Sequence, residues 1–123
     1  MKEILIIDDN KDNTDLAKLV LESSGYSCTT VNGGIEGLEQ LRKKRFDLTF
    51  LDLAMPQVGG IDVLQKLREE NLLSTTRIVL FTASPEFSDV EVERLKNEYN
   101  VSDRIRKPFS KKELLDVVTK NLA

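Results

Sequence analysis

Five polar residues stand where short apolar runs of the sequence end, and their types could support one chemistry. They are Asp8, Asp9, Asp52, Thr82 and Lys107. The apolar runs are ILII (4–7), LTFL (48–51), IVLF (78–81) and a shorter one around position 105. In an open parallel sheet, ligands bind beyond the carboxyl ends of the strands. We therefore predict that the five side chains converge on one crevice.

Three carboxylates in one crevice need a compensating cation. Two carboxylates about 4 Å apart repel by roughly 4 kcal/mol at an effective dielectric constant of about 20. Three cannot all stay ionised unless a cation joins them or some are protonated. All-oxygen ligands with open positions suit Mg²⁺, which keeps bound waters and accepts phosphate oxygens. With the positive charge of Lys107 and the hydroxyl of Thr82, this set predicts a clamp for a phosphoryl group in transfer, with one carboxylate as the covalent acceptor.

The elements that must position these residues alternate along the chain. Strands are predicted at 4–7, 28–31, 48–51 and 78–81 and briefly around 105, and helices at 13–24, 34–44, 60–70, 86–98 and 111–121. Three strands lack polar alternation, as strands covered on both faces do, whereas 28–31 is more polar and is predicted at an edge. Five strands alternating with five helices indicate an α/β fold, a parallel sheet with helices on both faces. Alternation alone does not determine the strand order.

The sequence also predicts the caps of two helices and the buried face of the first. The helix at 13–24 has Asp12 or Asn10 available as its cap, and the last helix opens with a capping box of Ser110 and Glu113. The residues predicted to form the buried stripe of the first helix are Leu16, Ala17, Val20 and Leu21.

Composition limits the function classes. The 123 residues fit one domain, 1–123, and the net charge of −3 argues against nucleic-acid binding. The local basic run from Arg42 to Arg45 is interpreted as a solvated helix end. There is no histidine, which excludes imidazole nucleophiles, imidazole metal ligands and a phosphohistidine on this chain. The single Cys28 is predicted to be a core residue in a reducing compartment, and the apolar run 4–7 is far too short for a membrane span, so the expected location is cytoplasmic.

Four motifs carry a resemblance to a known family: IIDDN (6–10), LDLAMP (51–56), FTAS (81–84) and RKPF (106–109). Together they resemble the receiver domain of two-component response regulators, in a stand-alone, chemotaxis-regulator-like form, over essentially the whole chain. The resemblance implies a doubly wound, flavodoxin-like five-stranded sheet with strand order 2-1-3-4-5. It also implies a phospho-acceptor signalling domain and not an enzyme acting on a separate substrate.

The resemblance implies a role for each matching residue. Asp52 would accept a phosphoryl group from a histidine kinase or a phosphotransfer protein, or from acetyl phosphate. Asp9 and Asp52 would bind Mg²⁺ directly, Asp8 largely through water, and the backbone carbonyl of Ala54 would complete the metal ligands. Lys107 would pair with the phosphoryl group.

Two further features are implied near the site. The peptide bond between Lys107 and Pro108 would be cis. The hydroxyl of Thr82 would swing to bond a phosphoryl oxygen and report phosphorylation to the far side of the sheet.

The chain departs from the family at Arg104, where receivers usually have a Tyr or Phe that turns inward as the threonine moves. A guanidinium does not easily enter an apolar slot unpaired. Two interpretations stay open: Arg104 is an exposed strand-end residue, or it contacts acidic side chains of a partner on the face formed by helix 4, strand 5 and helix 5. Tyr99 lies too far from Lys107 to take the aromatic role and is expected to pack a helix end. The small residues Ala54 and Ser84 leave the attacking water unobstructed but do not orient it, which predicts an intermediate phosphoryl lifetime.

Three alternatives remain. A haloacid-dehalogenase-like phosphatase would need a carboxylate two residues after its nucleophile, but Asn10 and Ala54 stand at that offset from Asp8 and Asp52. A flavodoxin-like module would need a hydroxyl- or glycine-rich loop where DDNKDN (8–13) stands. A pseudo-receiver that is never phosphorylated is the third. No output module follows within the sequence, so the chain either acts by protein contact or is one piece of a longer protein.

Overall fold

A computed structural model describes residues 1–83 and 87–122 of the chain. Its strands are β1 (Glu3–Ile7), β2 (Ser27–Val31), β3 (Leu48–Asp52), β4 (Ile78–Ala83) and β5 (Asp103–Lys107). Its helices are α1 (Lys11–Ser23), α2 (Gly34–Lys43), α3 (Gly60–Glu69), the short 3₁₀ helix η1 (Leu73–Thr75), α4 (Asp89–Tyr99) and α5 (Lys111–Leu122). The predicted order of strands and helices along the chain is confirmed.

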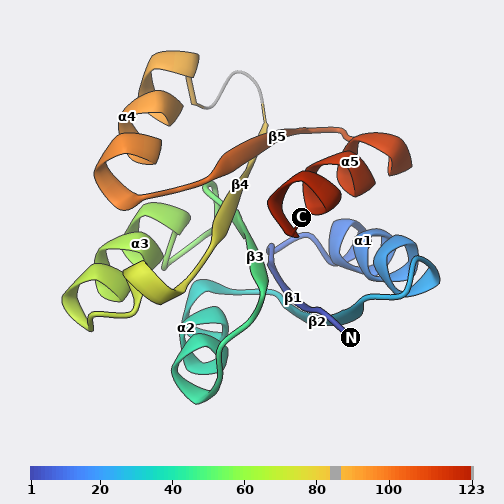
Figure 1. Cartoon of the computed structure of the whole chain (residues 1–123). Coiled ribbons are helices and arrows are strands. Elements are labelled where there is room, and N and C mark those ends of the chain that lie inside the picture. The colour runs from blue at the N-terminus through green and yellow to red at the C-terminus, as the bar shows by residue number, and fades with distance from the viewer. Residues whose placement is uncertain (84–86, 123) are drawn as a thin grey trace.

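The five strands form one parallel sheet in the order β2-β1-β3-β4-β5, which confirms the doubly wound α/β fold. Figure 1 shows α1 and α5 on one face of this sheet and α2, α3 and α4 on the other. The strand order reverses between β1 and β3, whose registered pairs include Ile7 with Leu51. In open α/β sheets, ligands bind beyond the carboxyl ends of the strands at such a reversal.

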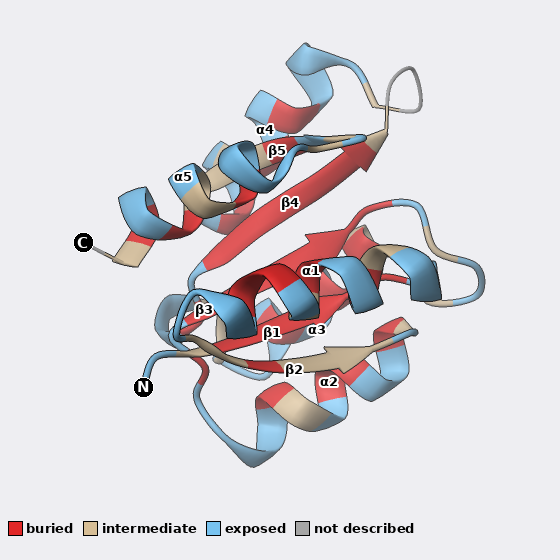
Figure 2. Cartoon of the chain, turned by 90° about the vertical axis from the view of Figure 1, so that its right-hand side faces the viewer, coloured by how far each residue is buried: buried red, intermediate tan, exposed pale blue. Residues whose placement is uncertain are grey.

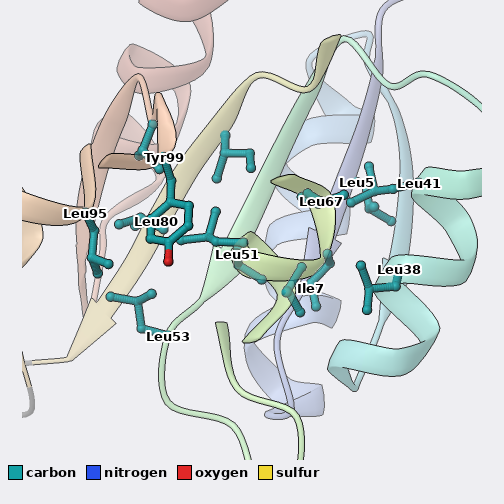
Figure 3. Packing of buried hydrophobic residues seen from close by; sticks show 14 of the residues in the cluster. Leu5, Ile7, Leu38, Leu41, Leu51, Leu53, Leu67, Leu80, Leu95 and Tyr99 are labelled. Atoms are coloured by element: carbon teal, nitrogen blue, oxygen red, sulfur yellow. The ribbon is translucent and has the colours of Figure 1, made fainter. Parts of the chain in front are cut away.

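The core consists of two apolar layers, one on each face of the sheet. Alternate residues of one strand point to opposite faces, so Leu5 and Ile7 pack toward α2, α3 and α4, while Ile4 and Ile6 pack toward α1 and α5. Figure 2 shows the central strands buried along their length, and Figure 3 shows the first layer, with Tyr99 of α4 packed among leucines. Burying each Leu or Ile side chain contributes about 1.5–3 kcal/mol, so the strands are held firmly from both sides.

The first helix differs from its predicted pattern. Leu16 was predicted on the buried stripe, but 50% of its surface is exposed. Thr14 is buried instead. Its burial is possible because its hydroxyl is hydrogen-bonded: the hydroxyl donates to the carbonyl of Lys11 at 3.0 Å and accepts from the side chain of Asn32 at 3.3 Å. The helix cap is Asn10, whose side chain accepts from the N–H of Asn13. Apolarity alone did not identify a buried threonine that satisfies its hydrogen bonds.

Side-chain caps determine where α4 and α5 begin. The helix predicted over 86–98 begins at Asp89, because Ser88 caps it by accepting the N–H of Glu91 at 3.2 Å. The capping box at the start of α5 is confirmed by Ser110 and Glu113, which exchange bonds of 3.2 and 3.0 Å. Within the described residues, no helix has the length and apolarity needed to cross a membrane.

Candidate functional site

The three acidic residues meet at the carboxyl ends of β1 and β3. Asp8 directly follows β1, and Asp52 is the last residue of β3. One carboxylate oxygen from each of Asp8, Asp9 and Asp52 lies within 4.8 Å of the other two. Asp8 is fully buried and Asp52 is only 4% exposed, whereas Asp9 faces solvent. An exposed carboxylate beside two buried ones gives the cluster an opening through which a cation can enter.

Lys107 at the end of β5 joins the two buried carboxylates. Its Nζ lies 2.7 Å from Oδ2 of Asp8 and 3.2 Å from Oδ2 of Asp52. The ammonium also lies 5.6 Å from the centre of the Phe81 ring. The peptide bond from Lys107 to Pro108 is cis, as the resemblance implies. The site therefore holds one ammonium, paired with two of its three carboxylates, which leaves a local excess of negative charge.

This excess charge perturbs ionisation. Burial, together with the neighbouring charge of Asp8, raises the pKa of Asp52 to about 7, although the ammonium of Lys107 and the N–H of Ala54 act in the opposite direction. Burial alone would lower the pKa of Lys107, but the hydrogen bond and charge of Asp8, and the charge of Asp52, raise it above its ordinary value. The lysine thus stays positive at neutral pH. A cation bound beside Asp52 would favour the ionised form of its carboxyl group.

Two other predicted site residues occupy neighbouring positions. Thr82 is buried in β4, one residue after Phe81, which pairs in register with Asp52. Ala54 donates its N–H to Oδ1 of Asp52 at 3.1 Å. Its carbonyl as a metal ligand stays a prediction, and Ser84 lies outside the described residues.

Asparagines that the sequence analysis did not assign to the site hold Asp8 in place. The N–H of Asn10 donates to Oδ1 of Asp8 at 2.9 Å, and the side chain of Asn32 donates to its backbone carbonyl at 2.8 Å. Asn10 also caps α1. An Asp side chain often accepts the backbone N–H two residues later and so forms a turn. This rule, applied to Asp8, could have identified Asn10 from the sequence. Asn32 follows β2 and could be placed only once the strand order was known.

Glycine allows α3 to begin directly against β3, the strand that carries Asp52. A Cβ on Gly60 would lie 2.5 Å from the backbone carbonyl oxygen of Asp52 and 2.7 Å from Cα of Leu53. The N–H of Gly60 donates to the carbonyl of Leu53 at 3.1 Å. Because backbone atoms cannot move aside as a side chain can, this position requires glycine, and the contact fixes the segment that carries Asp52.

Arg104 pairs within the chain. Its Nη2 lies 2.8 Å from Oδ1 of Asp89, the first residue of α4, and Arg106 pairs with the same oxygen. The hydrogen bond from Arg104 and the charge of Arg106 lower the pKa of Asp89. Only 23% of the Arg104 side chain is exposed, so its interpretation as an exposed strand-end residue is wrong. Asp89 compensates the charge of this partly buried guanidinium.

The two remaining single-residue expectations are confirmed. Tyr99 is 3% exposed, packs in the core at the end of α4 and lies under the guanidinium of Arg68, 4.6 Å from the ring centre. Cys28 is a buried core residue, and burial raises the pKa of its thiol to about 11.

Comparison with known proteins agrees with this architecture. The family described as Response regulator receiver domain matches residues 4–119. The chain is 35% identical over 114 residues to the DNA-binding response regulator MtrA of Mycobacterium tuberculosis, covering 93% of this chain and 47% of MtrA. It is 34% identical over 113 residues to the alkaline phosphatase synthesis transcriptional regulatory protein PhoP of Bacillus subtilis, covering 92% of this chain and 45% of PhoP. The chain thus spans about half the length of the curated relatives it matches.

A solved structure matches the chain from end to end. The chemotaxis protein CheY4 of Vibrio cholerae superposes with a TM-score of 0.88 at 26% identity, covering 99% of both chains. The family match, the strand order and the acidic cluster at the carboxyl ends of β1 and β3 all agree. The chain belongs to the response regulator receiver domain family, the signal-receiving part of two-component systems.

Proposed function

We propose that the chain accepts a phosphoryl group on Asp52 in an Mg²⁺-dependent reaction. The observation that carries this proposal is the cluster of Asp8, Asp9 and Asp52, within 4.8 Å of one another, with Lys107 bridging the two buried members. Asp52 is the member best suited to be the acceptor, because its carboxylate ends the central strand and has the N–H of Ala54 on one oxygen and Lys107 on the other.

The donor set fits a hard divalent cation. Asp8, Asp9 and Asp52 would hold Mg²⁺, with the Ala54 carbonyl as a further ligand, since Mg²⁺ prefers oxygen ligands and keeps open positions for phosphate. The raised pKa of Asp52, caused first by burial and then by Asp8, supports this fit because a cation would favour the ionised form. When bound, the ion supplies positive charge that compensates the phosphoryl oxygens.

Each residue of the site has its own role in the proposed phosphoryl transfer. An oxygen of Asp52 forms the new bond to phosphorus as the bond from phosphorus to the donor's imidazole nitrogen breaks, and the leaving nitrogen keeps the electron pair. Lys107, held positive by its neighbours, pairs with the charge on the phosphoryl oxygens. Thr82 is expected to donate its hydroxyl to one of them. The site is expected to assist its own phosphorylation and dephosphorylation without turning over a separate substrate.

Receiver domains in general take their phosphoryl group from histidine kinases, and the chain has no histidine of its own. The proposed donor is therefore a histidine kinase, a phosphotransfer protein or acetyl phosphate. The proposed output is contact with a downstream protein through the face of α4, β5 and α5. Arg104 and Arg106 on β5, paired with Asp89 of α4, support this choice because two guanidinium groups share one carboxylate there.

The test is intact mass after incubation with acetyl phosphate. We expect one phosphoryl adduct that requires Mg²⁺ and disappears in Asp52→Asn. The matched control is Asp12→Asn, which removes an exposed carboxylate of α1 outside the cluster and should keep the adduct. An adduct that survives in Asp52→Asn would overturn the assignment of the acceptor. No adduct in the unaltered chain with either acetyl phosphate or a phosphorylated histidine kinase would favour the pseudo-receiver.

A further inference from the structure

A groove lies at the end of the sheet opposite the acidic cluster. Its residues come from segments that precede strands: Lys2 before β1, Arg45 and Asp47 before β3, and Arg77 before β4. They line a cavity of about 280 Å³. A second cavity of about 300 Å³ shares Arg45, Arg77 and Thr75 with the first. We call these two cavities together the basal groove. Because a five-residue strand spans about 16 Å, the basal groove is separate from the site around Asp52.

Three cations line the basal groove, and the part of the chain that the structure describes offers them no carboxylate partner. Within residues 1–83 and 87–122, neither Lys2, Arg45 nor Arg77 has a carboxylate oxygen within 4.0 Å. Two other cations of the same region are paired, Arg42 with Glu70 and Lys44 with Glu3. Among the described residues, the cations that line the groove are therefore not neutralised by ion pairs, unlike Arg42 and Lys44 beside it. Most of the hydrogen-bond donors of these lining cations remain for a ligand.

One carboxylate also lines the groove, and it is already engaged. Oδ2 of Asp47 accepts the backbone N–H of Glu3 at 2.7 Å. Among the described lining residues, three cations stand against this one negative charge, which gives them a local excess of positive charge although the whole chain carries −3. Arg77 also donates one guanidinium N–H to the backbone carbonyl of Asn121. This contact orients Arg77 and leaves its other N–H groups for a ligand.

The groove offers more than charge. Phe46 and Leu122 add an apolar part to the first cavity, and Ser74 adds a hydroxyl to the second. Guanidinium groups bind phosphate oxygens through two parallel hydrogen bonds, and a phosphate ester provides up to two negative charges for such donors. A cationic rim beside a small apolar surface therefore suits an organic phosphate. Together the two cavities are large enough for a small ligand.

We propose that the basal groove binds a small phosphate-bearing molecule, with Arg45 and Arg77 as its phosphate ligands. The source of the phosphate is either free inorganic phosphate or a phosphate ester with an apolar part. The proposal does not depend on phosphorylation of Asp52, because the two sites share no residue.

The test is a titration of backbone amide resonances without Mg²⁺, using inorganic phosphate and adenosine monophosphate as probes. We expect saturable shifts confined to 44–47 and 74–77. Tighter binding of the nucleotide would identify an ester that uses the apolar part, and equal affinities would identify phosphate alone. Either result supports the proposal.

Variants separate a built site from general charge attraction. Arg45→Gln and Arg77→Gln should each weaken binding about tenfold, the loss of one charge-assisted contact. Arg45 is exposed, so its replacement leaves the core intact. The matched control is Lys43→Gln, which removes the same charge from an exposed residue of α2 outside the lining and should change affinity less than about twofold. Equal weakening in all three variants, or shifts that never saturate, would overturn the proposal. So would shifts produced by a short DNA duplex and by neither small probe.

Discussion

The raised pKa of Asp52 makes its carboxylate a source of instability at neutral pH, and Asp52→Asn should remove this instability. Burial first, and the charge of Asp8 second, raise this pKa from 3.8 to about 7. A difference of about three pH units corresponds to about 4 kcal/mol. Because the exposed Asp9 opens the cluster to water, solvent screening reduces this value, and we expect about 2 kcal/mol.

The raised pKa of Asp52 makes the free energy of unfolding depend on pH. Between about pH 4 and pH 7 the carboxyl group of Asp52 is protonated in the folded chain and ionised in the unfolded chain, so folding takes up a proton. The free energy of unfolding therefore falls as the pH rises through this range and then levels off. In Asp52→Asn this contribution is absent. The variant should be more stable than the unaltered chain by about 2 kcal/mol near pH 8, with almost no difference near pH 4.

The assay is urea unfolding in the presence of a chelator near pH 4 and near pH 8. Asp12→Asn, the exposed control, should change stability little at either pH. Addition of Mg²⁺ near pH 8 should stabilise the unaltered chain and have a smaller effect on Asp52→Asn, because the variant lacks one proposed ligand. If Asp52→Asn is no more stable than the unaltered chain near pH 8 without metal, burial does not penalise the carboxylate and the reasoning is refuted.

Three further predictions concern packing, an ion pair and a thiol. Gly60→Ala should lower the free energy of unfolding by more than about 2 kcal/mol, because its Cβ meets backbone atoms. Gly33→Ala should cost about 1 kcal/mol or less, because its Cβ meets only the carboxylate end of the exposed Glu36 side chain, which can move aside; equal losses in urea unfolding would contradict this. Arg104→Gln should raise the pKa of Asp89 toward its ordinary value, measured by NMR titration of the carboxyl carbon, and an unchanged pKa would mean that the pair does not form in solution. Cys28, with a pKa raised by burial to about 11, should react with a thiol reagent near pH 8 far more slowly in the folded chain than in urea; similar rates would show that the thiol is accessible.

The site could be predicted from the sequence because its residues stand at strand ends. Uninterrupted apolar runs such as 4–7 and 48–51 indicate strands covered on both faces, and the parallel arrangement then gathers the residues that follow them. Asp8 and Asp52 were therefore located with no knowledge of the strand order. The order itself came from the family resemblance, since alternation of strands and helices is compatible with several topologies.

The features that the sequence analysis missed depend on contacts between distant segments. Leu16 is exposed, whereas Thr14 is buried and its hydroxyl accepts a hydrogen bond from Asn32, 18 residues away. The pairing of Arg104 with Asp89 needs α4 to begin beside β5. The basal groove combines residues from three segments, and the basic run at 42–45 suggested only a solvated helix end. Hydrophobic periodicity carries no information on such pairings.

The two outer strands of the sheet differ in how readily they could template aggregation. β2 (Ser27–Val31) and β5 (Asp103–Lys107) each pair with only one strand in the described part of the chain. A strand of a second molecule added to β5 would approach Asp103, Arg104, Arg106 and Lys107, and charged side chains on an outer strand disfavour such addition. β2 has no charged residue and is rich in hydroxyl and apolar side chains. At high protein concentration, misassembly should therefore begin at β2, and a lysine placed there would be the change that prevents it.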